Sequence, residues 1–150
     1  MIVKSLFGTT ANAEKVYKFD LISDLSKVSI LTFGATIQSL IVPSKNATID
    51  VVLGYDELSS YEKFDGYLGA TVGRNCNRIK NSEFYLDGKH ILLNANDNLN
   101  NLHGGIMGFS HKSWKVCEVD EANNSLTLSL FSKDGDENFP SNLEVKTKYT

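Results

Sequence analysis

The run Val28-Ser-Ile-Leu-Thr-Phe33, followed after Gly34-Ala35 by Ile37-Gln-Ser-Leu-Ile-Val42, decides the fold class of this chain. β-Branched residues recur in both runs, and their apolar positions follow a period of two rather than 3.6, which predicts strands. Gly34-Ala35 separates the runs as a bend, and Pro43 closes the second one because proline cannot donate to a central ladder. We therefore expect two consecutive antiparallel strands here.

Runs of the same kind extend outward in both directions. The clearest is a hairpin in which Glu83-Phe-Tyr-Leu86 and His90-Ile-Leu-Leu93 flank Asp87-Gly88, a pair that readily takes the positive φ of a tight turn. Helix is expected only as one short turn within residues 57–64, with Ser59 or Ser60 as its N-cap. Further strands are predicted at residues 16–21, 49–53, 114–119, 126–131 and 143–149. About nine or ten short strands predict an all-β antiparallel sandwich.

Length and composition narrow the class of protein. The chain has 150 residues, which fits a single domain over residues 1–150, and its net charge of −3 offers no basic surface for nucleic acid or an anionic membrane. The sequence has no apolar run of about 20 residues, the length that would predict a membrane span. The N-terminus also lacks the apolar core of a signal peptide, so a cytoplasmic protein is expected. The three histidines and two cysteines show no ligand spacing, so neither a metal nor another cofactor is expected.

Two clusters carry polar residues that a plain folding domain would use little. They are Leu68-Gly-Ala-Thr-Val-Gly-Arg-Asn-Cys-Asn-Arg-Ile79 and Leu102-His-Gly-Gly105. In both, hydrogen-bonding side chains stand beside glycines that let the backbone turn sharply and approach another group closely. The loop from Asn94 to Asn101, rich in asparagine, leads into the second cluster and predicts many bonds from side chain to backbone. A pocket for a hydroxyl-rich ligand fits these features.

The same clusters resemble the N-terminal part of the aldose 1-epimerase, or galactose mutarotase, family. The resemblance rests on Gly69-Ala-Thr-Val-Gly-Arg74, Asn77-Arg-Ile79 and Leu102-His-Gly-Gly-Ile-Met-Gly-Phe109, followed by Trp114. It covers nearly the whole chain and implies a galactose mutarotase-like sandwich of which this chain is the N-terminal portion. It also implies an isomerase that interconverts the α and β anomers of free hexoses such as galactose and glucose, without a cofactor.

The resemblance assigns sugar-binding roles to Asn77, Arg78 and His103. Epimerisation needs a base to take the proton of the anomeric hydroxyl and an acid to protonate the ring oxygen. In the family these are a glutamate and a second histidine, and the resemblance implies that both belong beyond residue 150. The catalytic residues are therefore unassigned within these 150 positions.

Several alternatives stay open at this point. Arg78 could equally be a structural arginine paired with a carboxylate, and for Arg74 a structural role is favoured. His90 and His111 are expected to be surface residues, and Cys76 a small buried or half-buried filler. A non-catalytic carbohydrate-binding module is the alternative function, and an epimerase of hexose 6-phosphates is a third hypothesis, which would need a cationic cluster for the phosphate.

The last predicted strand, residues 143–149, alternates up to the final residue without a turn signal. We therefore expect the front part of a longer fold. The apolar face and unpaired edge of that strand would then favour self-association or a complementary C-terminal chain as a partner.

Overall fold

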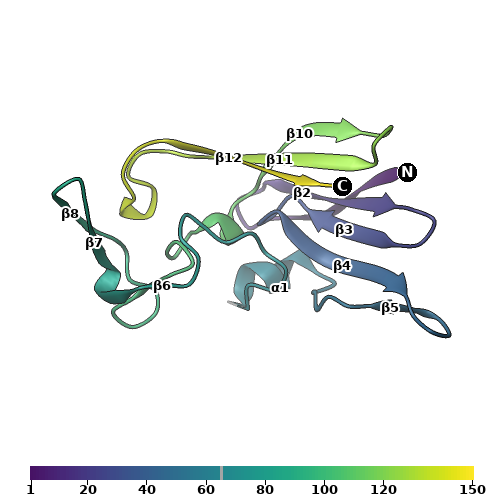
Figure 1. Ribbon diagram of the computed structural model, residues 1–150, viewed down its shortest axis with the longest axis horizontal. Coiled ribbons are helices and arrows are strands. Elements are labelled where there is room, and N and C mark those ends of the chain that lie inside the picture. Colours follow the sequence, from purple (N-terminus) through teal and green to yellow (C-terminus); the bar gives the residue numbers. More distant parts are fainter. Residues whose placement is uncertain (65) are drawn as a thin grey trace.

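The computed structural model describes residues 1–64 and 66–150, and its first third forms a five-stranded antiparallel sheet (Figure 1). The strands are β1 (Ile2–Thr9), β2 (Lys15–Ile22), β3 (Lys27–Leu31), β4 (Thr36–Pro43) and β5 (Thr48–Asp50), paired in sequence order. The two runs that decided the fold class are β3 and β4, and Gly34 and Ala35 between them both have positive φ. The expected antiparallel pair is confirmed.

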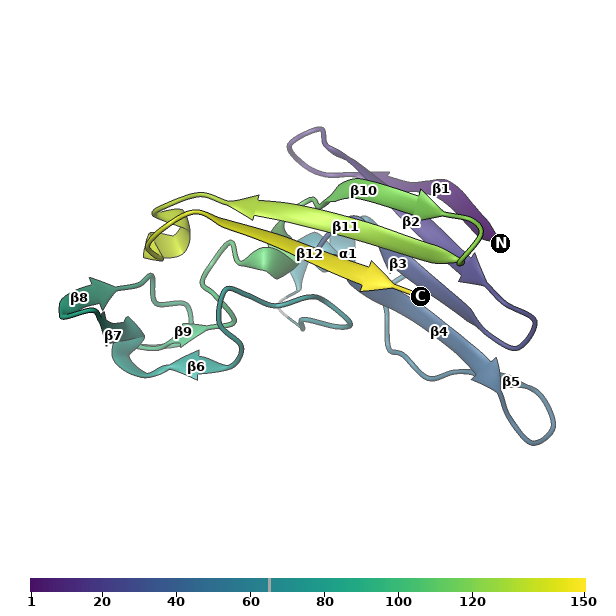
Figure 2. The ribbon, with the colours of Figure 1, turned by 45° about the horizontal axis from the view of Figure 1, so that its top comes forward.

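A second sheet of three strands covers one face of the first (Figures 1 and 2). It consists of β10 (Lys115–Asp120), β11 (Ser125–Ser132) and β12 (Leu143–Tyr149) in that order. Its inner side chains, those of β2 and β3, and residues of the adjoining segments form the main core: Phe19, Leu21, Ile30, Ala35, Phe109, Trp114, Leu126, Leu128 and Leu130. Two antiparallel sheets packed through such a core are the predicted sandwich.

The opposite face of the five-stranded sheet is covered by the helix α1 (Leu58–Lys63). Leu58 and Tyr61 of this helix pack with Val16, Leu31 and Phe33 in a second core cluster. The helical turn was predicted, but its N-cap is Glu57 rather than Ser59 or Ser60, and no side chain caps it. No helix in the described ranges combines the length and apolar character needed to cross a membrane.

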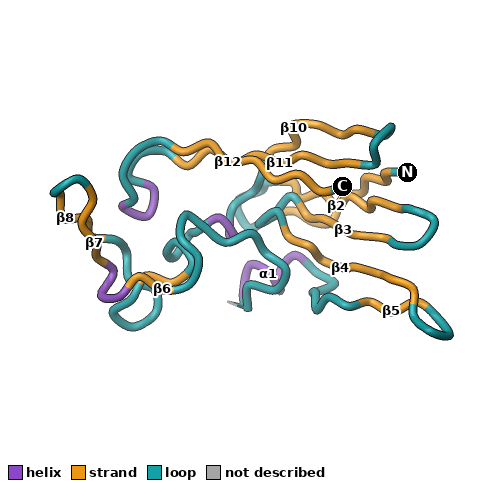
Figure 3. Tube along the Cα trace, viewed as in Figure 1, coloured by secondary structure: helices purple, strands orange, loops and turns teal. Residues whose placement is uncertain are grey.

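Two short ribbons extend from one end of the sandwich, where loops dominate the chain (Figure 3). One pairs β6 (Arg78–Ile79) with β9 (Asn101–Leu102), and the other is the predicted hairpin of β7 (Glu83–Leu86) and β8 (Lys89–Leu92). Asp87 and Gly88 take the expected positive φ values of 49° and 75°. Three 3-10 turns complete the described chain: η1 (Lys80–Ser82), η2 (Phe109–His111) and η3 (Asp136–Asn138).

Most predicted strands end within two residues of the observed ones, but β1, β6 and β9 were not predicted as strands, and β5 is shorter than predicted. β1 was not predicted, because its burial pattern is mixed and gives no clean alternation. β5 ends at Asp50, three residues early, because the Asp50 carboxylate accepts hydrogen bonds from the backbone N–H groups of Leu40 and Val52. One backbone hydrogen bond follows, from the Val51 N–H to the Leu40 carbonyl, and the Asp50 side chain then takes the Val52 N–H that a longer strand would have paired.

The η3 turn is fixed by Asp136, which forms an ion pair with Lys112 and accepts a hydrogen bond from Ser132. Burial raises the pKa of Asp136, but the hydrogen bonds from Lys112 and Ser132 and the charges of Lys112 and Arg74 outweigh it, so the pKa lies below its ordinary value. A carboxyl whose pKa is lower in the folded state stabilises the fold above its unfolded-state pKa. This stabilisation is lost as the pH falls through the folded-state pKa.

We therefore expect Asp136→Asn to lower the free energy of unfolding at neutral pH, and the difference from wild type to shrink as the pH falls below about 4. Urea unfolding of both proteins at several pH values measures this difference in the free energy of unfolding. Asp24→Asn, at an exposed aspartate, is a control for removing one negative charge. A difference that stays constant with pH down to the acid unfolding region would contradict the role of the ionised carboxylate.

Candidate sugar-binding site

Pairing of β6 with β9 brings the two predicted clusters together. Arg78 lies opposite Leu102 in this ribbon, so Asn77 and His103 are neighbours at its end. The His103 N–H donates to the Asn77 carbonyl over 3.1 Å, and the Asn77 N–H donates to Nδ1 of His103 over 3.1 Å. Both residues have positive φ, 62° and 51°. The three residues predicted to bind sugar therefore share one site.

The bond from Asn77 fixes the protonation state of the His103 ring. Because Nδ1 accepts a hydrogen bond from a backbone N–H, the proton of the neutral imidazole must be on Nε2. Nε2 makes no hydrogen bond to another described residue. The ring packs edge to face against Tyr67, with 4.7 Å between centroids. His103 is thus held as an oriented hydrogen-bond donor.

Arg78 is held from the other side by the loop that precedes β9. Its Nε donates to the Asp97 carboxylate over 2.6 Å, and its Nη1 donates to the Asn77 side-chain oxygen over 3.3 Å. Asp97 sits in a tight turn closed by backbone hydrogen bonds to and from Asn100. Arg78 is therefore paired with a carboxylate, as one of the two expectations had it. This pairing leaves other N–H groups of the guanidinium available for a ligand, so it is compatible with the second expectation, a role in ligand binding.

Two further residues hold the His103 loop, and the sequence interpretation named neither. The Asn96 side chain donates to the carbonyls of Leu102 and Gly105 and accepts from the Leu102 N–H, so it bridges both ends of the loop. Glu137, from the distant η3 turn, accepts hydrogen bonds from the N–H groups of Ile106 and Met107. The asparagine-rich loop did predict side-chain bonding of the Asn96 kind, whereas nothing near Glu137 in sequence signalled its contact.

Arg74 has a structural role, as the sequence interpretation favoured. Its guanidinium donates to the Ser132 hydroxyl and carbonyl and to the carbonyls of Lys133 and Pro140, all at 2.8 to 2.9 Å. These acceptors lie at the end of β11 and in the loop toward β12. Arg74 therefore ties the first polar cluster to the three-stranded sheet.

A cleft of about 440 Å³ opens beside this ribbon. Its walls connect directly to the proposed site, because Tyr67 packs against His103 and Asp97 pairs with Arg78. Its lining residues are Tyr67, Ala95, Asn96, Asp97, Leu102 and Ile106. The volume and the mixture of apolar wall and hydrogen-bonding groups suit a monosaccharide.

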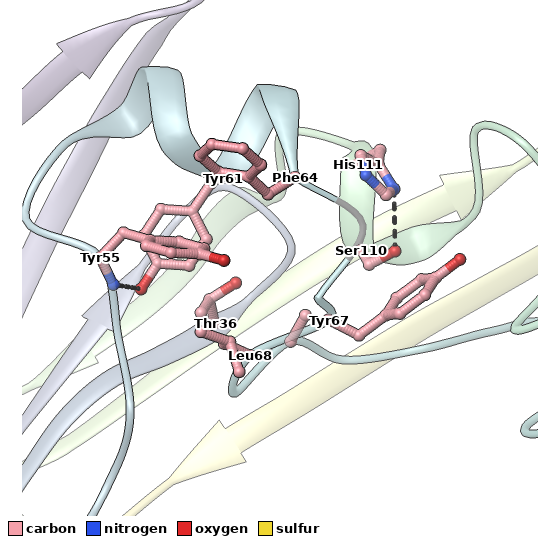
Figure 4. Close-up of a pocket in the computed structure, with 9 residues that line it drawn as sticks. Thr36, Tyr55, Tyr61, Phe64, Tyr67, Leu68, Ser110 and His111 are labelled. Atoms are coloured by element: carbon pink, nitrogen blue, oxygen red, sulfur yellow. Dashed lines mark hydrogen bonds between the residues drawn. The ribbon is translucent and has the colours of Figure 1, made fainter.

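A second, narrow pocket shares Tyr67 with this cleft and is lined largely by aromatic rings (Figure 4). The Tyr55 N–H donates to the Tyr61 hydroxyl over 2.9 Å, and Ser110 bonds the His111 ring over 3.1 Å. Burial raises the pKa of Tyr61, so this hydroxyl stays protonated at neutral pH. The described lining of this pocket contains no Asp, Glu, Lys or Arg side chain.

Two expectations for single residues were wrong. His111 is not a plain surface residue but is half-buried, with its ring against Phe33 and Tyr67. Cys76 is exposed rather than buried, because it stands in an exposed segment with Asn77 and Arg78. His90 is a hairpin surface residue as expected, bonded to Glu83. Across residues 1–64 and 66–150 no three His, Cys, Asp or Glu side chains lie close enough together to hold a metal ion.

Comparison with known proteins agrees with this architecture. The sequence profile described as aldose 1-epimerase matches residues 17–150. Galactose mutarotase of Bos taurus is 40% identical, and the match covers 99% of this chain and 43% of that protein. Aldose 1-epimerase of Haemophilus influenzae is 38% identical, and the match covers 95% of this chain and 42% of that protein.

Solved structures give the same result. A GalM/aldose epimerase homologue from C. elegans has a TM-score of 0.78 and 36% identity, over 85% of this chain and 39% of that chain. Galactose 1-epimerase from Lactobacillus acidophilus has a TM-score of 0.83 and 25% identity, over 99% and 44%. The chain thus spans less than half the length of these relatives. Because the family profile and these relatives match nearly all of it, the chain belongs to the aldose 1-epimerase family.

Proposed function

We propose that residues 1–150 form one galactose mutarotase-like domain whose cleft binds free hexoses, galactose or glucose, for interconversion of their α and β anomers. Asn77, Arg78 and His103 are the proposed sugar-binding residues. The observation that carries the proposal is the hydrogen bond from the Asn77 N–H to Nδ1 of His103, because it leaves Nε2–H as a fixed donor. A fixed donor beside a guanidinium is well suited to hold sugar hydroxyl or ring oxygens.

The chemistry of anomer exchange sets what such a site must supply. A base removes the proton of the anomeric hydroxyl, an acid protonates the ring oxygen, the ring opens, and closure on the other face of the aldehyde gives the other anomer. Arg78 and a neutral His103 supply orientation and hydrogen bonding. By resemblance to the family, we propose that the glutamate base and the second, acidic histidine come from positions beyond residue 150.

The alternative is a carbohydrate-binding module without catalysis. It is favoured by the character of the cleft, whose described lining offers hydrogen-bonding groups but only one carboxylate, Asp97, already paired with Arg78. The two functions predict the same sugar binding. The epimerase and the binding module differ in one respect: only in the epimerase do an acid and a base act on the sugar bound in this cleft and exchange its anomers.

Binding and anomer exchange should be measured on the same purified chain. We expect glucose and galactose to bind with saturation, and His103→Ala to weaken binding about tenfold, the effect of losing one hydrogen bond. Polarimetry on freshly dissolved α-glucose and α-galactose should give the rate of a buffer blank. His90→Ala, an exposed hairpin histidine, is the matched control and should bind like wild type.

Each outcome has a distinct meaning. Exchange faster than the blank that disappears in His103→Ala would show that a complete acid and base pair lies within these 150 residues, contrary to the proposed position beyond them. Absence of binding for both sugars would overturn the proposed function. If the rate equals the blank, addition of a chain carrying the remaining family segments should start exchange for an enzyme and leave it unchanged for a binding module.

The free edge of β12 bears on possible partners. Within the described part of the chain β12 pairs with β11 alone, so its other edge exposes backbone donors and acceptors. We propose that this edge takes part in self-association or in contact with a complementary chain. Sedimentation at several concentrations tests it, and a monomer at every concentration without added chain would contradict the self-association.

A further inference from the structure

The cleft beside β6 and β9 has an unusual charge arrangement for a site that contains an arginine. Of its lining residues, Asp97 alone carries a charge, and none of the other described residues in that lining is a cation. Arg78, the nearby cation, is bound to that same Asp97 through its Nε at 2.6 Å. The carboxylate side chain is 26% exposed and the arginine side chain 54%, so the acidic partner is the more enclosed of the two.

The pairing also limits how Arg78 can bind an anion. A guanidinium grips a phosphate or carboxylate best with two parallel donors from one edge of its fork. One edge of the Arg78 fork contains Nε, which is engaged by Asp97, and the other contains Nη1, which donates to Asn77. Each edge therefore has one donor already engaged. Single hydrogen bonds to neutral hydroxyl groups remain available, but a two-donor grip on an oxyanion requires breaking an existing bond.

Asp97 is fixed in this position by its own loop. Its backbone N–H donates to the Asn100 carbonyl over 3.1 Å, and the Asn100 N–H returns a bond to the Asp97 carbonyl over 2.9 Å. The side chain of Asn100 in turn accepts from the Asn81 N–H at the start of the hairpin. These bonds hold the backbone of Asp97, and the ion pair with Arg78 orients its carboxylate, so moving this charge away from an entering anionic ligand requires breaking the ion pair.

We propose that Asp97 is a specificity-determining residue that makes the cleft select uncharged sugars over sugars carrying a phosphate or a carboxylate. This inference rests on the proposed sugar-binding function. Asp97 neutralises Arg78, engages one of its donors and places negative charge in the cleft wall, and all three effects disfavour an anionic sugar. The charge of a sugar phosphate would face this carboxylate across a partly enclosed cleft, where screening by water is weaker than at an open surface.

The test compares glucose with glucose 6-phosphate by isothermal titration calorimetry on the full 150-residue chain. Wild type should bind glucose at least about tenfold more tightly, and Asp97→Asn should raise the relative affinity for glucose 6-phosphate about tenfold. Asparagine keeps the size of the side chain and an oxygen that accepts from Arg78, so glucose affinity should change less than about threefold. The gain for glucose 6-phosphate should diminish as salt is raised.

Two further variants make the result decisive. Asp87→Asn removes the same charge from the turn of the β7 and β8 hairpin, and it should leave the affinity ratio unchanged. Asp97→Glu keeps the charge and should keep the preference for glucose. An unchanged ratio in folded Asp97→Asn, or a lost preference in Asp97→Glu with intact glucose binding, overturns the role of Asp97. If wild type binds neither sugar, the proposed function itself fails, which is a separate result.

Discussion

Replacing Gly104 by alanine should destabilise the chain by about 3 to 5 kcal/mol and abolish sugar binding, the largest effect expected of any single methyl group in this structure. Gly104 has φ of 92°, which costs an L-residue about 1 to 2 kcal/mol. A Cβ at this position would also lie 1.6 Å from the carbonyl oxygen of Gly73 and 2.5 Å from the backbone nitrogen of Arg74. Backbone atoms cannot rotate away as a side chain does, so the two segments must separate.

The consequence for binding follows from the place of Gly104 in the chain. It comes directly after His103, and the Gly73 carbonyl that a methyl group would displace also accepts a hydrogen bond from the Phe109 N–H. Moving Gly104 therefore moves the imidazole and loosens the attachment of η2. At about 2 to 4 °C per kcal/mol for a chain of this size, the midpoint of thermal unfolding should fall by about 6 to 20 °C.

Gly88→Ala separates backbone strain from the steric clash. Gly88 has a similar φ of 75°, but a Cβ there would have no atom within 4 Å. Its substitution should cost about 1 kcal/mol from the strain alone and leave sugar affinity intact. Differential scanning calorimetry of both variants gives the comparison. Equal losses in the two variants would mean that the contact between Gly73 and Gly104 contributes nothing beyond conformational strain.

The strands of this fold were largely predictable because their signals are local. Alternation placed β3, β4, β11 and β12, and Asp-Gly placed the hairpin between β7 and β8. Each of these features depends on residues within a few positions of one another. β1 escaped because its side chains are mostly exposed, so burial does not impose a period of two on its sequence.

The site was predictable only in part, because half of it depends on long-range pairing. Asn77, Arg78 and His103 were named from the resemblance, and their proximity became clear only from the pairing of β6 with β9. Asn96 stood within a loop already expected to bond to backbone. Glu137 lies 34 positions from His103 in the sequence, so its contacts with Ile106 and Met107 could not be inferred from spacing.

Arg74 and Arg78 show why residue type alone was insufficient. They stand four positions apart in one polar cluster, and either could have faced a ligand. Arg74 instead turns toward β11 and is fully engaged by Ser132, Lys133 and Pro140. Arg78 pairs with Asp97 of the cleft lining, with its own side chain 54% exposed. The environment that distinguishes them is contributed by residues about 60 positions away for Arg74 and about 20 for Arg78.

This division predicts opposite effects for the two arginines. Arg74→Met should lower the free energy of unfolding by about 2 to 4 kcal/mol, because it leaves backbone carbonyls near Ser132 and Pro140 without their donor. Arg78→Met should change it by less than about 1 kcal/mol, since the Arg78 side chain is 54% exposed and its ion pair with Asp97 is accessible to water on that side. Sugar affinity should fall about tenfold to a hundredfold in Arg78→Met, where a charge-assisted hydrogen bond to the ligand is lost.

The comparison is sharpest when binding is measured at a temperature where both variants are folded, with urea unfolding measured in parallel. Arg74→Lys adds a test of the fork itself, because lysine keeps the charge but cannot reach all four acceptors with the fixed planar geometry of a guanidinium. It should be nearly as destabilising as Arg74→Met. If Arg74→Lys restores wild-type stability, charge rather than directed hydrogen bonding connects this cluster to the three-stranded sheet. If Arg74→Met is stable but fails to bind sugar, the roles assigned to the two arginines must be exchanged.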